Sequence, residues 1–118
     1  MPCANNRDEI PLGTLDMLIL QPLSRNNELH GFEIAENIQR VSGDILQVEE
    51  GSLYPALQRM LMKGWLTAEW GKTAENRRAR YYRLTKASKK QLSEQLKRYE
   101  RTSQAIARIV QPVYEAGV

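Results

Sequence analysis

Apolar side chains recur every three to four residues in three segments of the first half of the chain, and this period predicts three helices. The first, over about residues 14–23, is apolar on several sides, so we expect it at the centre of the core. The second, over residues 32–41, is amphipathic and is expected to end at Ser42 and Gly43. Residues 44–51 then form a short connector to the third helix.

The third helix has an apolar face and a more polar outward face. Its apolar positions are Leu53, Leu57, Met60 and Leu61. The residues that point outward are Ser52, Pro55, Arg59 and Met62, with Gln58 beside them. We expect Ser52 to be the N-cap, which puts Pro55 in the first turn, where no helical N–H bond is lost. Gly64 is expected to end the helix in the left-handed conformation.

After Gly64 the pattern changes from helical to extended. Residues 65–70 and 77–85 are rich in Trp, Tyr and Thr, and Gly71 and Asn76 between them favour a turn. We therefore predict a two-stranded antiparallel hairpin. Its apolar face is expected to consist of Trp65, Trp70, Tyr82 and Leu84. The cations around its loop are Lys72, Arg77, Arg78 and Arg80.

Residues 85–110 predict one long helix, in which spacings of four and three residues alternate between the positions of a single stripe. These positions are Leu92, Leu96, Tyr99, Ser103, Ile106 and Val110, of which Ser103 is the polar member. A 3.5-residue period is typical of contact between two helices, and the stripe is longer than a domain of this size covers. We therefore predict a homodimer; the alternative is a terminal helix that packs on its own domain.

Three helices followed by a basic hairpin is the element order of a winged helix-turn-helix. We predict a mainly α (α+β) fold with this architecture and a long C-terminal dimerisation helix. The chain of 118 residues has the length of one compact domain. Within it we assign residues 1–9 to a disordered or frayed N-terminus, residues 10–84 to the winged helix-turn-helix, and residues 85–118 to the dimerisation helix and tail.

Positive charge is concentrated in the second half of the chain. Residues 1–58 contain three basic and nine acidic residues, whereas residues 59–118 contain fourteen basic and five acidic ones. The net charges are therefore −6 and +9. One surface can present this excess to a polyanion such as double-stranded DNA, although a solvated helix rich in Lys and Arg gives the same count.

Several other classes of protein find no support in the sequence. No apolar run has the length of a membrane span, and the first residues lack a signal peptide, so we expect a cytoplasmic protein without membrane contact. The single cysteine, Cys3, and the single histidine, His30, offer neither an internal disulfide nor a set of metal ligands. We expect no cofactor.

Five motifs resemble those of a known family. In order along the chain they are "GTLDMLIL", "HGFEIAENIQ", "GSLYPALQRM", "KGWLTAEWG" and "RRARYYRLT". They look like the successive motifs of the PadR family, the phenolic-acid decarboxylase repressor type of bacterial transcription regulator, and the resemblance covers about residues 12–90. It implies a winged-helix domain with a C-terminal dimerisation helix that binds operator DNA and usually represses a neighbouring gene. In some members a small aromatic or lipophilic effector near the dimer interface releases the DNA.

The chain departs from the family pattern at three places. Phe32 stands where the family usually has Tyr, and the Met60–Met62 run replaces an "RLE"-like run beside the third helix's outward face. Ser88 stands where Gly is common, which leaves the start of the long helix open.

The candidate DNA contacts come from the third helix and the hairpin. At the positive end of the helix, Ser52 suits a phosphate oxygen. Arg59 can bind a guanine edge or a phosphate, and Gln58 an adenine. We expect the Tyr54 ring mainly in the core, with its hydroxyl near the DNA backbone. The other candidates are Pro55 and Lys63 on the helix, where Lys63 can simply stabilise the helix dipole, and Lys72, Arg77, Arg78 and Arg80 on the hairpin.

An enzyme and a different binding module are the alternatives. The adjacent carboxylates Glu49 and Glu50 have no acid–base partner nearby, and the sequence contains neither a nucleophile elbow nor a phosphate-binding loop, so we expect no catalysis. A winged helix that binds protein or RNA stays open, because a fold does not fix a function. In a DNA-binding homodimer, the two-fold axis would make the target an inverted repeat.

Overall fold

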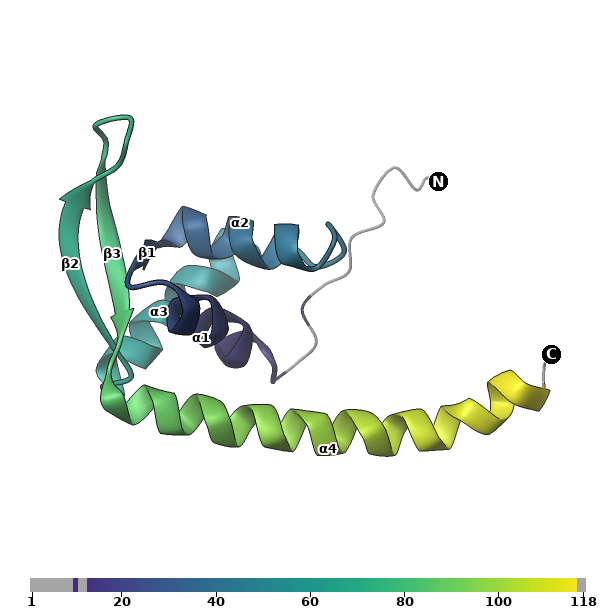
Figure 1. The fold of residues 1–118 in the computed structure, drawn as a ribbon. Helices are drawn as coiled ribbons and strands as arrows, with labels where there is room; N and C mark the ends of the chain where they lie inside the picture. Colours follow the sequence, from purple (N-terminus) through teal and green to yellow (C-terminus); the bar gives the residue numbers. More distant parts are fainter. Residues whose placement is uncertain (1–9, 11–12, 117–118) are drawn as a thin grey trace.

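The computed structural model describes residue 10 and residues 13–116, with side chains as far as Gln111. The predicted frayed segment 1–9 therefore lies outside the described residues. The elements along the chain are α1 (Leu15–Arg25), β1 (Leu29–His30), α2 (Gly31–Val41), α3 (Glu50–Met62), β2 (Leu66–Lys72), β3 (Arg78–Leu84) and α4 (Lys86–Ala116). In Figure 1, α1, α2 and α3 form one group, the β2–β3 hairpin stands at its side, and α4 runs below the group and past it. No helix in the described part is long and apolar enough to cross a membrane.

The predicted winged helix-turn-helix is confirmed, with one strand that the sequence did not predict. The sheet has three strands in the order β1-β3-β2, and both pairings are antiparallel. Leu29 of β1 pairs with Tyr82 of β3, and outside the ladder Arg83 Nη2 donates to Glu28 Oε1 at 2.8 Å. A two-residue strand among polar residues has no detectable period, so only the presence of β3 reveals it.

The core lies where the three short helices meet the base of the hairpin. Its fully buried aliphatic residues are Ile19 and Leu20 of α1, Ile34 of α2, and Leu53, Leu57 and Met60 of α3. Leu66 and Tyr82 extend it into the sheet, and Leu92 extends it into α4. The central place predicted for α1 is therefore confirmed: it packs against α2, β3 and α4.

The prediction for the start of α3 is wrong. The N-cap is Glu49 in an extended conformation, and Ser52 is the third helical residue, whose N–H donates to Glu49 O at 3.0 Å. The helix begins earlier because Glu50 places a negative charge in the first turn, where the helix dipole favours it. Pro55 therefore lies in the second turn, and its ring removes the N–H that would bond to Gly51 O. Gly51 is exposed, so water can reach this end of the helix.

The predicted end of α3 is confirmed. Gly64 has a φ of 78°, and its N–H donates to Leu61 O at 3.1 Å. The next residue, Trp65, donates to Met60 O at 3.0 Å, which completes a Schellman motif. This motif turns the chain from α3 directly into β2.

Two hydroxyls fix the start of α4. Thr85 Oγ1 donates to Gly64 O at 2.8 Å and accepts from Ser88 N at 3.3 Å. Ser88 is fully buried, and its Oγ donates to Thr85 O at 2.7 Å. The serine that replaces the family's glycine is thus accommodated, and the helix continues to Ala116, beyond the predicted end at Val110.

Candidate nucleic-acid interface

The buried residues of α3 determine which side chains it presents to solvent. Leu53, Ala56, Leu57 and Met60 face the core, so a helical period places Gly51, Pro55, Gln58 and Met62 in the middle of the opposite face. All four of these, with Ser52 at the N-terminal end, are exposed. Gln58 is therefore more central on this face than Arg59.

Arg59 lies on the flank of α3 that faces α1. Its Nη2 donates to Asp16 Oδ1 in the first turn of α1, and the two side chains are 47% and 20% exposed. Asp16 belongs to the first family motif, but nothing in the sequence links it to Arg59, because the two residues are 43 positions apart. This ion pair joins the exposed edge of α3 to the helix at the centre of the core.

Tyr54 lies on the other flank of α3, against the start of α2. It is 46% exposed, so the expectation that its ring is mainly in the core is wrong. A Cβ on Gly31 would lie 2.8 Å from the Tyr54 hydroxyl oxygen and 2.9 Å from Cε1. The missing side chain of Gly31 therefore creates the space in which the Tyr54 ring packs, and the hydroxyl lies at the N-terminus of α2.

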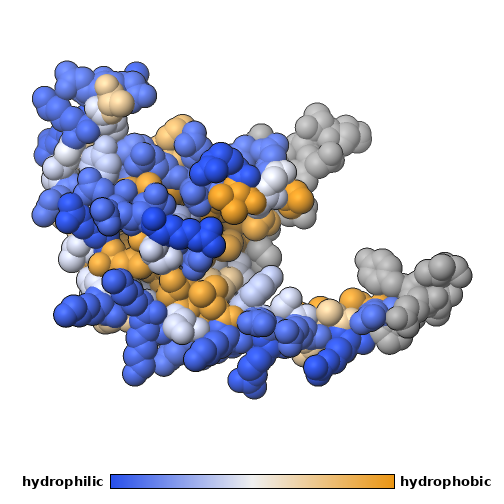
Figure 2. Space-filling view, viewed as in Figure 1, coloured by the Kyte–Doolittle hydropathy of each residue, from blue (hydrophilic) through white to orange (hydrophobic). Residues whose placement is uncertain are grey.

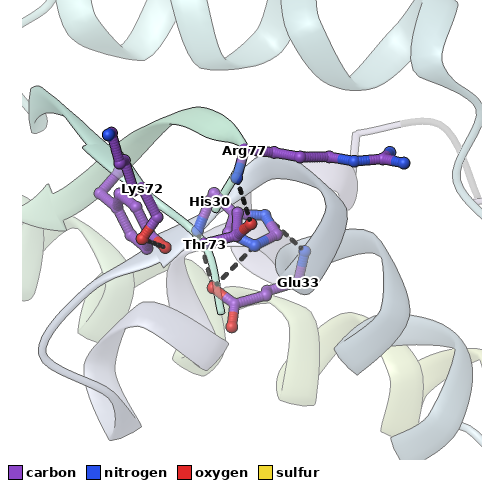
Figure 3. A network of polar contacts seen from close by, with 6 residues as sticks. His30, Glu33, Lys72, Thr73 and Arg77 are labelled. Carbon is purple, nitrogen blue, oxygen red and sulfur yellow. Dashed lines mark hydrogen bonds and ion pairs between the residues drawn. The ribbon is translucent and has the colours of Figure 1, made fainter. Parts of the chain in front are cut away.

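The start of α2 carries a reciprocal cap that fixes the single histidine (Figure 3). Glu33 N donates to His30 Nδ1 at 3.4 Å, and His30 N donates to Glu33 Oε1 at 3.1 Å. The His30 ring also meets the edge of Tyr81 of β3, with ring centres 5.3 Å apart. His30 thus has a structural role, because it caps α2 and connects this helix to the sheet.

The predicted hairpin and its basic loop are confirmed. β2 and β3 pair from Leu66 opposite Leu84 to Lys72 opposite Arg78. Asn76 has a φ of 65°, and the backbone N–H of Thr73 donates to Arg77 O at 2.8 Å, which closes the loop. In Figure 3 the Arg77 side chain extends away from the His30–Glu33 pair, and it is exposed.

The aromatic residues of the hairpin divide between core and surface. Tyr82 is buried, and Trp65 and Leu84 pack against the core as predicted. The prediction for Trp70 is wrong: it is 60% exposed, and the Arg78 guanidinium carbon lies 4.3 Å from its ring centre. Trp70 lies far along the hairpin, beyond the helices that cover Tyr82, so it supports a cation instead of filling the core.

An open groove of about 990 Å³ separates the hairpin from the starts of α2 and α3. Tyr54 and the exposed Phe32 are on its helical side. The residues on its hairpin side include Trp70, Arg77, Arg78 and Arg80, and carboxylates reach it from Glu33, Glu36 and Glu75. The groove thus brings one flank of α3, the N-terminus of α2 and three of the four hairpin cations around one space.

Of the predicted DNA contacts, Tyr54, Arg77, Arg78 and Arg80 line this groove, whereas Lys63, Lys72 and the predicted residues of the outward face of α3 do not. Lys63 is the C-cap of α3, and its Nζ lies 4.7 Å from the Trp65 ring centre. Lys72 is exposed at the end of β2. Both residues belong to the basic second half of the chain, but neither lies in the space between α3 and the hairpin.

The apolar stripe of α4 is covered only at its beginning. Leu92 is buried, whereas Leu96, Tyr99, Ser103, Ile106 and Val110 are all exposed. The alternative in which the stripe packs on its own domain therefore holds for Leu92 alone. Figure 2 shows hydrophilic side chains along the lower edge of α4 and hydrophobic ones on its upper edge, beside the open space to the right of the domain.

Comparison with known proteins decides the family. The model of the transcriptional regulator PadR-like family matches residues 19–94. The chain belongs to this family. The PadR-like family is one of transcription regulators rather than enzymes, and the resemblance of the five sequence motifs is confirmed.

The relatives of this PadR-like chain cover most of its length. A protein of Lysinibacillus sphaericus, described as uncharacterized protein X, is 31% identical over 85% of this chain and 91% of its own length. A transcriptional regulator from Clostridium thermocellum has a TM-score of 0.75 at 28% identity, covering 83% of this chain and 94% of that one. Bacillus subtilis PadR, solved in complex with operator DNA, has a TM-score of 0.62 at 26% identity, covering 73% of this chain and 48% of that one.

Proposed function

We propose that this PadR-like protein is a sequence-specific, dimeric DNA-binding repressor that recognises an inverted-repeat operator. The observation that carries the proposal is that one groove brings a flank of α3, at Tyr54, close to three cations of the basic hairpin. A duplex needs both kinds of contact, because side chains in the major groove read bases while cations fix the backbone. The complex of Bacillus subtilis PadR with operator DNA supports the same partner for this chain.

In this proposal α3 enters the major groove with Gln58 at its centre. A Gln amide can bond an adenine edge with two hydrogen bonds. Ser52 and Pro55 approach the backbone near the start of the helix, and the Tyr54 hydroxyl does so beside the N-terminus of α2. Helix N-termini attract phosphate through their free N–H groups and their dipole.

The hairpin acts as the wing and holds the sugar-phosphate backbone. Its cations are Lys72, Arg77, Arg78 and Arg80, and Lys63 adds a positive charge at the end of α3. The stacking of Arg78 on Trp70 limits the freedom of this long side chain, so less entropy is lost when it binds a phosphate. The carboxylates that line the groove repel phosphates. A polyanion that does not also form specific contacts therefore binds weakly, and this favours a duplex that fits the site.

The dimer rests on the uncovered stripe of α4. Its exposed apolar side chains, from Leu96 to Val110, have the spacing of a helix-to-helix contact, and a second copy of α4 fits that spacing. Residues 10–84 then form the DNA-binding unit and residues 85–118 the dimerisation unit. Repression, action in the cytoplasm, and release by a small aromatic or lipophilic effector near Tyr99 and α1 belong to the same proposal, and the resemblance of the sequence motifs supports them.

The test is selection of bound duplexes from a random pool with the purified chain. We expect one enriched sequence with inverted symmetry, and affinity for it that falls steeply with salt. If each wing cation of both protomers contacts one phosphate, about eight contacts give a slope of log K against log salt near −7. No enriched duplex and a flat salt response would contradict the proposal and favour a protein-binding module.

Two substitutions separate the proposed base reader from the backbone clamp. Gln58→Ala should lower the preference for the operator over random DNA, because it removes a base contact. Arg78→Ala should weaken both complexes about equally and reduce the salt slope by about two, because it removes one phosphate contact from each protomer. The opposite pattern would contradict the roles that we give to α3 and the wing.

A further inference from the structure

We propose that Asp16 determines the DNA specificity of this chain by positioning Arg59, a role that rests on the proposed DNA-binding function. Asp16 is on α1, outside both α3 and the wing, and it belongs to the first family motif, "GTLDMLIL". It acts through a second residue and need not touch the DNA itself.

The geometry of the ion pair carries the proposal. Arg59 donates to Asp16 through Nη2, while its side chain stays 47% exposed on the flank of the face centred on Gln58. A guanidinium has five N–H donors in a rigid planar fork, so the donors that Asp16 does not use remain for the two acceptors of a guanine edge. Asp16 is only 20% exposed, and it belongs to the helix at the centre of the core. The partner of Arg59 is thus a well-fixed one.

Without Asp16, the Arg59 side chain would be mobile in the protein before it binds DNA. A long, half-exposed side chain loses rotamer freedom when it binds, and this loss weakens the complex. Asp16 removes part of that loss, because it holds the fork in one place before the DNA arrives. The affinity is raised only for a guanine at one position in the operator, because two hydrogen bonds to that base need the Arg59 guanidinium in one orientation.

The carboxylate also acts against random DNA. In a non-specific complex, Arg59 can gain only by moving to a phosphate, and this would leave the Asp16 carboxylate near a polyanion without its partner. The ion pair with Asp16 therefore lowers the contribution of Arg59 to the affinity for random DNA, while it favours the contact with the operator guanine. Both effects raise the ratio of operator affinity to random-DNA affinity.

A purely structural role for the pair predicts something different. An ion pair at the surface contributes about 1 kcal/mol or less to folding. Its loss would then shift the unfolding midpoint slightly and leave the affinity ratio unchanged. The affinity ratio is therefore the measurement that separates the two roles.

The experiment compares wild type, Asp16→Asn, Arg59→Ala and the double variant on the selected operator and on a random duplex of equal length. We expect Asp16→Asn to lower the affinity ratio about three- to tenfold, the range for ordering one long side chain on binding. In the Arg59→Ala background, Asp16→Asn should have no further effect. Operator duplexes with 7-deazaguanine, which lack the N7 acceptor, should bind wild type more weakly and leave Arg59→Ala unaffected.

The matched control is Glu28→Gln. It removes a carboxylate from a second ion pair with an arginine, Arg83, and it changes the net charge by the same amount. We expect its affinity ratio to equal that of wild type. A thermal unfolding transition shows whether each variant is folded. If Asp16→Asn does not fold, Asp16→Ser takes its place in the same comparison.

Two results would overturn the proposal: an unchanged affinity ratio for Asp16→Asn, or an equal fall in the Arg59→Ala background. Failure of the proposed function would look different, because wild type itself would then enrich no duplex.

Discussion

The exposed stripe of α4 gives a quantitative test of the proposed dimer. Ile106 lies on the stripe and is 55% exposed, whereas Ile109 lies beside the stripe and is 74% exposed. Both are isoleucines of one helix, three positions apart, so truncation to Ala changes helix propensity and hydrophobicity by the same amount. Only their angular position differs.

The magnitude follows from the exposed area. Full burial of an isoleucine side chain stabilises by about 1.5–3 kcal/mol, and Ile106 has roughly half of its area left to bury in a dimer. Two-fold symmetry places this contact in the interface twice. Ile106→Ala should therefore cost about 1.5–3 kcal/mol per dimer, which raises the dimer Kd about 10- to 150-fold. For Ile109→Ala we expect less than a threefold change.

Sedimentation equilibrium over a range of concentrations measures the dimer Kd of each variant. Far-UV circular dichroism checks that α4 remains helical. If Ile109→Ala weakened the dimer as much as Ile106→Ala, the 3.5-residue stripe would not be the contact. If neither variant changed the Kd, α4 would not be the dimer helix at all.

Three further predictions concern the fold and the groove. Gly31→Ala should displace the Tyr54 ring into solvent and weaken operator binding about three- to tenfold, while stability changes by only about 1 kcal/mol, because the half-exposed ring can move. Thr85→Ala should lower the free energy of unfolding by about 1–2 kcal/mol in urea, because α4 loses its N-cap. Burial raises the pKa of Tyr82 above its ordinary value of 10.0, although the nearby Arg80 partly opposes this. The neutral phenol is thus favoured in the fold, so the contribution of Tyr82 to stability should be constant up to about pH 10 and fall above it.

Each of these has a control. Tyr54→Phe should reproduce the binding loss of Gly31→Ala without the steric change, and full binding by Gly31→Ala would refute the role of the ring. Thr67→Ala, at an exposed position of β2, should leave the urea midpoint unchanged. Tyr82→Phe should remove part of the fall in stability above pH 10, and an identical pH profile would show that Tyr82 does not cause it.

The order of elements could be predicted because each one carries its own local signal. The periods of α1, α2 and α3, the Gly64 stop, the basic hairpin and the long helix all depend on neighbours within a few residues. The family motifs gave the same winged helix, and the family match confirmed it. The start of α3 was missed because hydroxyl capping by Ser52 competed with the charge of Glu50, and the chain uses Glu49 without a side-chain cap.

The details of the candidate interface depend on contacts between distant segments. Leu29 pairs with Tyr82 and Glu28 bonds to Arg83 although these partners are more than fifty positions apart, and Trp70 is exposed because the helices do not reach that part of β2. In the same way, the orientation of Tyr54 depends on the missing side chain of Gly31.

The elements, their order, the polar outer face of α3 and the apolar stripe of α4 can be predicted from the chain alone, since they arise from periods within single segments. The central place of Gln58 on α3, the pairing of Asp16 with Arg59, and the groove between α2, a flank of α3 and the wing become visible only in the packed fold. A helical period gives the direction of each side chain only relative to its own helix. Which other segment a side chain meets is decided by the packing of the whole core.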